Sequence, residues 1–230
     1  MHIFISDAHI RLDTSYRGRK LMEFLRKAKP KLQGLYILGD LFEFWFEYNI
    51  VFPKDYFQIL AQLYNFVQDG IPVHYVLGNH EVMIGSFLRN FGFIVHEEHA
   101  QLMIENKRVY IAHGHLIDKR LWTTLWRKLL TSKLNHICYS LIHPDIGVFL
   151  AQGIAYLSRK QKRSPRSIAA LEAYARQKLQ DTDVVMLAHT HIPVFKQYND
   201  DHYYINTGDW ITHFSYGVIN RSEVALRYYS

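Results

Sequence analysis

The strongest constraint on the fold of this chain is a set of five short polar clusters, each of which directly follows a short apolar run. The runs are Ile3–Ser6, Leu35–Leu38, Val73–Leu77, Val109–Ala112 and Val184–Ala188. The clusters are Asp7-Ala8-His9, Gly39-Asp40, Gly78-Asn79-His80-Glu81, His113-Gly114-His115 and His189-Thr190-His191. Uncharged runs of this length are typical of strands buried in a parallel or mixed sheet. Ligands of open α/β sheets bind at the carboxyl ends of strands, so we expect the clusters to meet at one edge and hold two metal ions.

Helices and strands alternate along the first half of the chain. Helical spacing predicts a helix from Arg17 to Lys29, ended by Pro30, and another from Pro53 to Gly70, with a short helix around Gly85–Asn90. Further strands are expected near Phe93–Val95 and at Leu102–Glu105, Val194–Tyr198, Tyr203–Asn206, Phe214–Ile219 and Glu223–Tyr229. This order predicts an α/β layered fold in one domain, residues 1–230.

A basic helical segment separates the fourth cluster from the fifth. From residue 118 to about residue 180 only helical periodicity is found, ending in a helix at Arg166–Leu179 capped by Ser164-Pro165. Both ends of this segment leave the expected site, so we predict a cap that lies over or beside it. Between Lys119 and Lys178 there are twelve Lys and Arg residues against two acidic residues, in a chain with a net charge of +6.

The charge of this segment favours an anionic partner, such as a phosphorylated substrate, phospholipid head groups or nucleic acid. A basic face that is merely solvated is the alternative. Its large apolar side chains suit an acyl chain, although ordinary helix packing explains them equally well. These side chains are Trp122, Trp126, Phe149 and Tyr156.

The rest of the composition limits the class of protein. The only cysteine, Cys138, excludes an internal disulfide and a thiolate zinc site and indicates a reducing compartment. Met1–Ser6 resembles a strand rather than a signal peptide, and no apolar stretch approaches the roughly 18 residues of a spanning helix. We therefore expect a soluble or membrane-peripheral protein.

The residue types of the clusters indicate a manganese-like ion. Carboxylate and amide oxygens suit hard divalent cations, and imidazole suits manganese, iron or zinc. A single buried histidine is more often structural than a ligand. The metal site is therefore inferred from seven residues taken together, because all of them follow expected strands. These residues are Asp7, His9, Asp40, Asn79, His113, His189 and His191.

Taken in order, the five clusters resemble the motifs of the calcineurin-like metallophosphoesterase superfamily over essentially the whole chain. The resemblance implies a β-sandwich flanked by helices, with two divalent ions, expected to be Mn²⁺, at its site. It implies that one metal is held by Asp7, His9 and His191, the other by Asn79, His113 and His189, with Asp40 bridging. A bridging hydroxide would attack phosphorus. His80 would assist the leaving group or the phosphoryl charge, and His9 is a second candidate for proton transfer.

Within that superfamily, the chain looks most like the UDP-2,3-diacylglucosamine pyrophosphatases of lipid A biosynthesis. The resemblance lies in Gly39-Asp40-Leu41-Phe42-Glu43 with Trp45, the basic insertion, and Gly208-Asp209-Trp210. It implies hydrolysis at the α-phosphate of UDP-2,3-diacylglucosamine, giving UMP and 2,3-diacylglucosamine 1-phosphate. It also implies a cytoplasmic protein that is peripheral to the inner membrane and has no nucleic-acid partner.

The chain departs from this family at three places. His80 stands where the family has Arg, His115 stands where it has Asp, and only Glu47 remains of the acidic pair that usually follows the Trp. Another metallophosphoesterase, acting on a nucleotide or a small phosphoester, therefore remains an alternative.

Seven residues are expected to contact the substrate. They are Asn79, His80, Trp45, Asp118, Arg159, Lys160 and Lys162. For the aromatic run that contains Trp45, core packing is the alternative to lining a pocket. A non-catalytic membrane- or nucleic-acid-binding module that uses Arg159–Arg163 is the remaining alternative for the whole chain.

Overall fold

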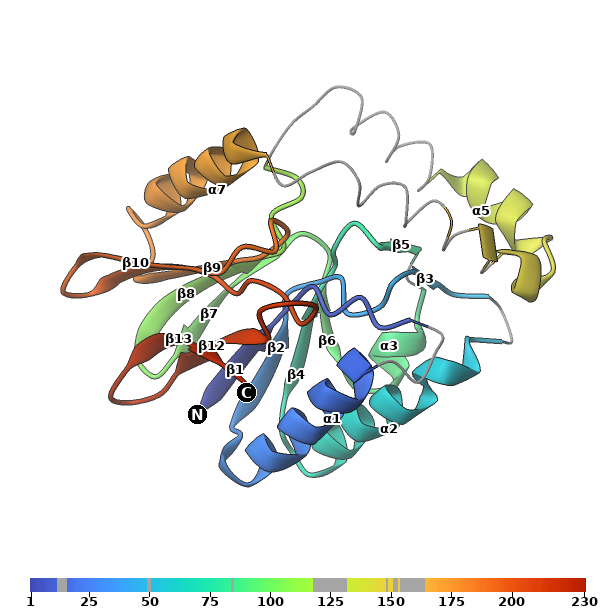
Figure 1. Ribbon diagram of the computed structural model, residues 1–230, viewed down its shortest axis with the longest axis horizontal. Coiled ribbons are helices and arrows are strands. Elements are labelled where there is room, and N and C mark those ends of the chain that lie inside the picture. Colours follow the sequence, from blue (N-terminus) through green and yellow to red (C-terminus); the bar gives the residue numbers. More distant parts are fainter. Residues whose placement is uncertain are drawn as a thin grey trace.

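The computed structural model describes residues 1–11, 16–48, 51–83, 85–117, 132–147, 149–150, 153 and 164–230. The described strands form two large sheets and one two-stranded sheet (Figure 1). The first sheet contains, in spatial order, β13 (Val224–Tyr228), β12 (Ser215–Ile219), β1 (His2–Ile5), β2 (Gly34–Ile37), β4 (Val73–Val76) and β6 (Ile94–His96). The second contains β10 (Val194–Asn199), β11 (His202–Asn206), β9 (Val184–Leu187), β8 (Lys107–Ala112) and β7 (His99–Ile104). The small sheet pairs β3 (Trp45–Phe46) with β5 (Glu81–Met83).

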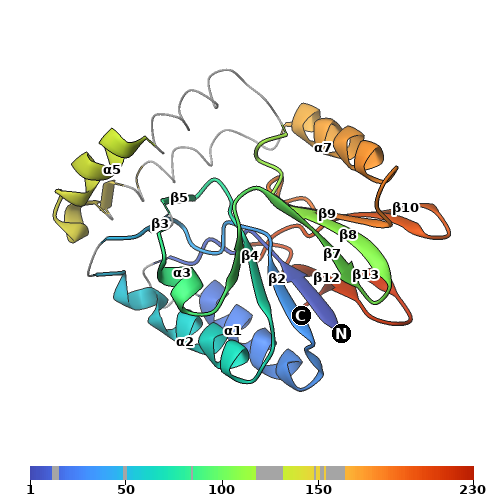
Figure 2. The ribbon, with the colours of Figure 1, turned by 180° about the vertical axis from the view of Figure 1, so that it is seen from behind.

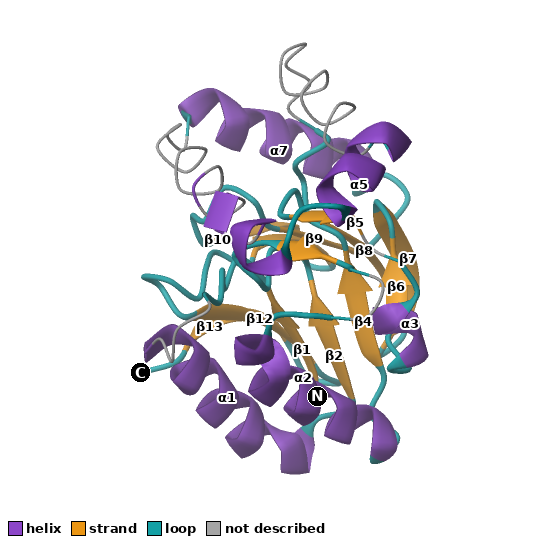
Figure 3. Cartoon of the chain, turned by 90° about the vertical axis from the view of Figure 1, so that its right-hand side faces the viewer, coloured by secondary structure: helices purple, strands orange, loops and turns teal. Residues whose placement is uncertain are grey.

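Helices cover the outer faces of both large sheets (Figure 3). The described α-helices are α1 (Tyr16–Ala28), α2 (Phe57–Gln68), α3 (Phe87–Asn90), α5 (Lys133–Ser140) and α7 (Pro165–Lys178). Short 3₁₀ turns at Lys29–Lys31 and Lys54–Tyr56 follow α1 and precede α2. The α/β layered fold expected from the sequence is confirmed.

Strand alternation explains the layers. In β1, Ile3 and Ile5 belong to the core beneath α1 and α2, whereas Phe4 between them belongs to the core between the two sheets. In β9, Met186 lies in the core between the sheets, whereas Val185 packs beneath α7. Each of these strands is buried on both faces, which is why its sequence is apolar throughout.

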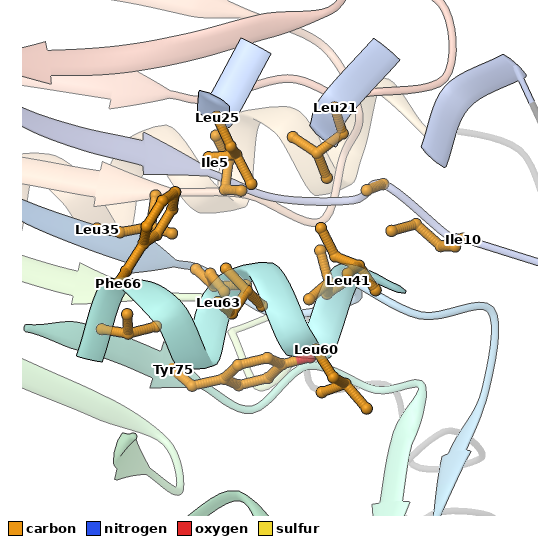
Figure 4. Close-up of a cluster of buried hydrophobic side chains, with 14 of the residues drawn as sticks. Ile5, Ile10, Leu21, Leu25, Leu35, Leu41, Leu60, Leu63, Phe66 and Tyr75 are labelled. Atoms are coloured by element: carbon orange, nitrogen blue, oxygen red, sulfur yellow. The ribbon is translucent and has the colours of Figure 1, made fainter. Parts of the chain in front are cut away.

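The two helices of the first half fix the first sheet. Leu60, Leu63 and Phe66 of α2 point toward the sheet (Figure 4), and all three are buried. Helix α1 ends at Ala28 before Pro30, as predicted. Helix α2 is followed by Gly70, whose φ of 77° allows the left-handed turn that closes the helix.

The orientation of the strands places the polar clusters at one end of the sandwich. Strands β1, β2 and β4 are parallel neighbours in the first sheet, and β8 and β9 are parallel neighbours in the second. The loops that carry the clusters therefore leave the same ends of adjacent strands. The pairing of β3 with β5 was not predicted, and it joins the loops that follow β2 and β4.

Of the predicted cap at residues 118–180, residues 118–131, 148, 151–152 and 154–163 lie outside the described ranges. Its last helix, α7, begins at Ser164, whose Oγ accepts the backbone N–H of Arg166 at 3.2 Å. Leu171 and Ala175 then pack on the outer face of the second sheet, so α7 is a layer of the main body. Helix α5 lies toward the opposite end of the molecule from α7 (Figures 1 and 2). Among the described helices, none is long and apolar enough to cross a bilayer.

Candidate metal centre

Hydrogen bonds of backbone N–H groups join the loops that carry the first, second and fifth clusters. The N–H of Asp7 donates to the carbonyl of Gly39 at 3.1 Å, and the N–H of His9 donates to that of Asp40 at 3.0 Å. Across the two sheets, the N–H of His189 donates to Asp7 Oδ2 at 3.0 Å. The clusters from both sheets therefore form one assembly.

Five of the seven predicted ligands have left-handed backbones. The φ angles are 49° at Asp7, 44° at His9, 52° at Asp40, 72° at His189 and 59° at His191. Residues other than glycine rarely adopt this region, and holding them there costs about 1–2 kcal/mol each. The chain thus bends sharply directly after three of the buried strands, and such strain is concentrated at functional sites.

Two of the interleaved glycines are required by close packing. A Cβ on Gly78 would lie 2.1 Å from Asp40 Oδ1, and a Cβ on Gly39 would lie 2.7 Å from His113 Nδ1. Any side chain at these two positions would displace a predicted ligand.

Metal-ligating atoms gather in three overlapping groups at this site. Asp7, His9 and His191 form one, Asp7, Asp40 and His113 form another, and His9, Asp40 and His80 form the third, with the atoms of each group within 4.8 Å of one another. His191 Nε2 lies 3.3 Å from Asp7 Oδ1, and His113 Nε2 lies 3.4 Å from Asp40 Oδ2.

Several of these atoms fit a cation. Asp7 Oδ1 and both ring nitrogens of His9 are buried and have no hydrogen-bond partner within the described part of the chain. Buried polar atoms nearly always have partners, and a group of unsatisfied carboxylate oxygens and imidazole nitrogens is suited to a divalent ion.

The two remaining predicted ligands, Asn79 and His189, lie beside His113. Asn79 Oδ1 is 3.2 Å from His113 Nε2, and the ring of His189 is 5.1 Å from that of His113. His113 Nδ1 donates to the carbonyl of Leu38 at 2.7 Å, which assigns the proton to Nδ1 and turns Nε2 toward Asp40 and Asn79. The structure therefore brings all seven predicted ligands together.

The electrostatics of the site favour ionised carboxylates. Burial raises the pKa of Asp7, but the charge of His191 and the nearby His9 imidazole outweigh it and lower the pKa to about 2. For the His113 imidazole, burial has the opposite effect and lowers the pKa. The charge of Asp40 outweighs burial and raises the pKa of His113 to about 10. For His189, burial and the charge of His113 lower the pKa to about 4. A cation that binds here must therefore displace a proton from His113.

His80 is held at the edge of this cluster. Its Nδ1 donates to the carbonyl of Glu43 at 2.7 Å, and its backbone N–H donates to Asp40 Oδ1 at 3.0 Å. Its Nε2 lies 3.8 Å from Asp40 Oδ2, and its ring meets that of His9 edge to face at 4.6 Å. The ring nitrogen on the site side is thus Nε2.

Sequence reasoning assigned no role to Glu81, which organises the loops beneath the site. Its Oε2 accepts the backbone N–H groups of Asp40 at 3.0 Å and Gly78 at 2.7 Å, and the hydroxyl of Tyr75 donates to its Oε1 at 2.8 Å. Burial, together with the charge of Asp40, raises the pKa of Glu81 to about 7. Its place in the Gly-Asn-His-Glu cluster was the only signal in the sequence.

Unlike the predicted metal ligands, most of the predicted substrate-contacting residues are not found at the site in the described part of the structure. Trp45 is 1% exposed and packs against Phe42, Tyr56 and Phe87, so the structure favours the core-packing alternative for this residue. Four others, Asp118, Arg159, Lys160 and Lys162, lie outside the described residues.

The chain is similar to a family of known proteins and to several individual members of it. The family model of the calcineurin-like phosphoesterases matches residues 3–193. A Porphyromonas gingivalis protein named UDP-2,3-diacylglucosamine hydrolase is 26% identical over 250 residues, covering 97% of this chain and 95% of that protein. A protein of the same name from Haemophilus influenzae is 26% identical and covers 90% of this chain and 89% of its own length. A crystal structure of a Vps29 mutant from Entamoeba histolytica covers 98% of this chain and 89% of its own, at 17% identity and a TM-score of 0.49.

Proposed function

Because this chain belongs to the calcineurin-like phosphoesterase family, with the family model matching residues 3–193, we propose that it hydrolyses UDP-2,3-diacylglucosamine at the α-phosphate. The products would be UMP and 2,3-diacylglucosamine 1-phosphate, an intermediate of lipid A biosynthesis. The observation that carries this proposal is the buried cluster of Asp and His side chains with unsatisfied oxygen and nitrogen atoms. Relatives named for this substrate, aligned over nearly the whole chain, supply the choice among phosphoesters.

The proposed cofactor is a pair of Mn²⁺ ions. Asp7, His9 and His191 would hold one, Asn79, His113 and His189 the other, and Asp40 would contact both. The mixture of carboxylate, amide and imidazole donors without a thiolate supports manganese over a structural zinc. When bound, such a pair makes water nucleophilic at neutral pH and stabilises charge on a phosphoryl group.

His80 is proposed to act on the phosphate. Its Nδ1 is engaged by the Glu43 carbonyl, which leaves Nε2 on the side of Asp40. From that position Nε2, when the ring is protonated on both nitrogens, can donate to a non-bridging phosphate oxygen or to the oxygen of the leaving group. His9, whose ring nitrogens have no hydrogen-bond partner within the described ranges, is the second candidate for proton transfer.

Attack at the α-phosphate is tested by isotope labelling. Hydrolysis with Mn²⁺ in H₂¹⁸O should place the label in UMP, read by mass spectrometry, because water attacks the phosphorus bonded to uridine. Label in the sugar phosphate would contradict the proposed site of attack. Asp40→Asn is the matched control, since it keeps the shape of the side chain but removes its charge, and it should show no turnover.

Substrate identity requires a separate comparison. We expect turnover of UDP-2,3-diacylglucosamine to exceed that of UDP-glucosamine and of simple nucleotide esters under the same manganese concentration. Equal or faster hydrolysis of the nucleotides would favour a nucleotide phosphoesterase instead.

We further propose that the protein is cytoplasmic and binds the inner-membrane surface through the α5 region. Tyr139 of α5 packs on Phe46, with ring centroids 4.4 Å apart, which anchors this helix to the loop that follows β2. Exposed apolar side chains then lie on α5 and the residues after it. They are Ile137 (56% exposed), Leu141 (82%), Ile146 (57%), Phe149 (75%) and Leu150 (46%). Apolar side chains beside a basic segment suit an anionic lipid surface.

Cosedimentation with anionic phospholipid vesicles tests the membrane proposal. Phe149→Glu should reduce the bound fraction, whereas Phe57→Glu, at a residue 61% exposed on α2, should not. Equal binding by both variants would refute the assignment of this surface. Binding that is lost only with Lys and Arg changes at residues 159–163, together with intact function of Asp40→Ala, would favour the non-catalytic module.

A further inference from the structure

Asp209 is a buried carboxylate that lies in the loop between β11 and β12, outside the five clusters. It is 0% exposed. Its Oδ1 accepts the backbone N–H groups of Thr212 and His213, each at 2.9 Å, and that of Ile211 at 3.3 Å. Three backbone donors on one oxygen hold this carboxylate in a single orientation.

The other oxygen of Asp209 faces the predicted metal ligand His191. His191 Nδ1 lies 3.5 Å from Asp209 Oδ2, and its Nε2 lies 3.3 Å from Asp7 Oδ1. The imidazole therefore lies between two carboxylates, one on each ring nitrogen. Nδ1 is buried and makes no hydrogen bond within the described ranges, and Asp209 Oδ2, at 3.5 Å, is the carboxylate oxygen that faces it.

The ionisation of Asp209 is consistent with this arrangement. Burial raises the pKa of its carboxyl group, but the neighbouring His191 imidazole and hydrogen bonds from the backbone of His213 and Thr212 outweigh it and hold the pKa well below its usual value. The three backbone N–H groups that donate to Oδ1 show the carboxylate acting as an acceptor. A second imidazole, that of His213, approaches the same carboxylate, with Nδ1 3.2 Å from Oδ1.

We propose that Asp209 is a positioning residue that keeps the proton of His191 on Nδ1, so that Nε2 presents its lone pair to a metal ion beside Asp7. This inference rests on the metal centre of the proposed function. Histidine ligands commonly donate their second ring N–H to a carboxylate, which fixes the tautomer and the ring orientation, and losing that partner typically weakens metal affinity 10–100-fold. Asp209 supplies that partner from a loop that none of the predicted ligands occupies.

The sharpest test is Asp209→Asn, because it separates the two oxygens. The remaining amide oxygen can still accept the backbone N–H groups of residues 211–213, so the turn is preserved. The new NH₂ group faces His191 Nδ1 and can only donate, which favours the tautomer that carries its proton on Nε2. We expect Mn²⁺ affinity, measured by calorimetry, to fall about 10–100-fold, with unchanged circular dichroism.

Two further measurements exclude a merely structural role. Two-bond ¹H–¹⁵N NMR spectra of the metal-free protein, recorded at a pH at which the His191 ring is neutral, should show its proton on Nδ1 in the wild type and on Nε2 in Asp209→Asn. His213→Ala removes the other imidazole from the same carboxylate and should leave manganese affinity unchanged.

The outcomes distinguish this inference from the function on which it rests. If wild-type His191 is protonated on Nε2, or if Asp209→Asn binds manganese as tightly as the wild type, Asp209 does not set the tautomer, and the metal centre stands. If the wild type binds no manganese, both the centre and this inference are overturned.

Discussion

Proton release on manganese binding follows from the environment of His113. With metal removed by a chelator, Asp40 holds the pKa of His113 at about 10, against a usual value of about 6.5. At pH 7 only about one His113 ring in 1,000 is then neutral, so freeing Nε2 for a metal costs about 4 kcal/mol. The apparent affinity for Mn²⁺ should therefore rise about tenfold per pH unit between pH 6 and pH 8.

Calorimetric titration in two buffers with different ionisation enthalpies measures this proton directly. At least one proton should be released per metal pair. His143→Ala, which removes an imidazole that is 68% exposed, should leave the slope unchanged. An affinity that is flat between pH 6 and pH 8, with no proton released, would refute the ion pair of His113 with Asp40 as the source of the barrier.

The stability of the metal-free protein provides an independent check, because it should fall with rising pH whereas the affinity for Mn²⁺ should rise. Because the folded-state pKa of His113 is raised, its stabilisation is fully present below about pH 6.5 and is lost as pH rises through about 10. The free energy of unfolding of the metal-free protein should fall by about 2–3 kcal/mol from this group between pH 7 and pH 9, as measured by urea denaturation. A rise over that interval would contradict the assignment.

Three further predictions concern the ligand set, the core and acid stability. Asn79→Ala, at an exposed side chain, should lower turnover by orders of magnitude without changing the melting temperature, and calorimetry should count one metal ion fewer. Leu63→Ala, at a fully buried residue of α2, should destabilise the protein by about 2–5 kcal/mol and lower its melting temperature by about 5–15 °C, with kcat unchanged where the protein remains folded. Burial and the neighbouring His96 lower the pKa of His74 to about 4, so stability should decline as pH falls from about 6.5 toward 4, and His74→Leu should flatten that decline in acid denaturation.

Much of the fold could be predicted because the strands are buried on both faces. Ile3–Ile5 and Val184–Leu187 are apolar throughout, and no polar alternation obscures where each strand ends. The helix ends were equally readable from Pro30 and Gly70. The pairing of β3 with β5 was not predictable, because it joins two loops whose contact is set by tertiary packing rather than by any local pattern.

The site was predictable in composition but not in its supporting contacts. Residue types and their positions after strands predicted that the seven proposed ligands would lie close together, as the structure shows. Nothing in the sequence distinguishes a carboxylate proposed to hold a metal ion, such as Asp40, from one that joins the loops beneath the site through two backbone N–H groups, such as Glu81. The aromatic run around Trp45 was likewise compatible with both a core and a pocket, and only burial separates the two. The contact of Asp209 with His191 joins two loops, and no periodic pattern in the sequence predicts it.

The positive φ angles of the ligand residues have a consequence for protein engineering. Glycine adopts that region without penalty, so replacing Asp7 or His191 with glycine should relieve local strain while removing a proposed metal-binding group. Screens that select only for heat resistance would thus enrich inactive variants at these positions. A more thermostable enzyme of this kind is better sought in its helices and outer strands, where activity and durability do not compete.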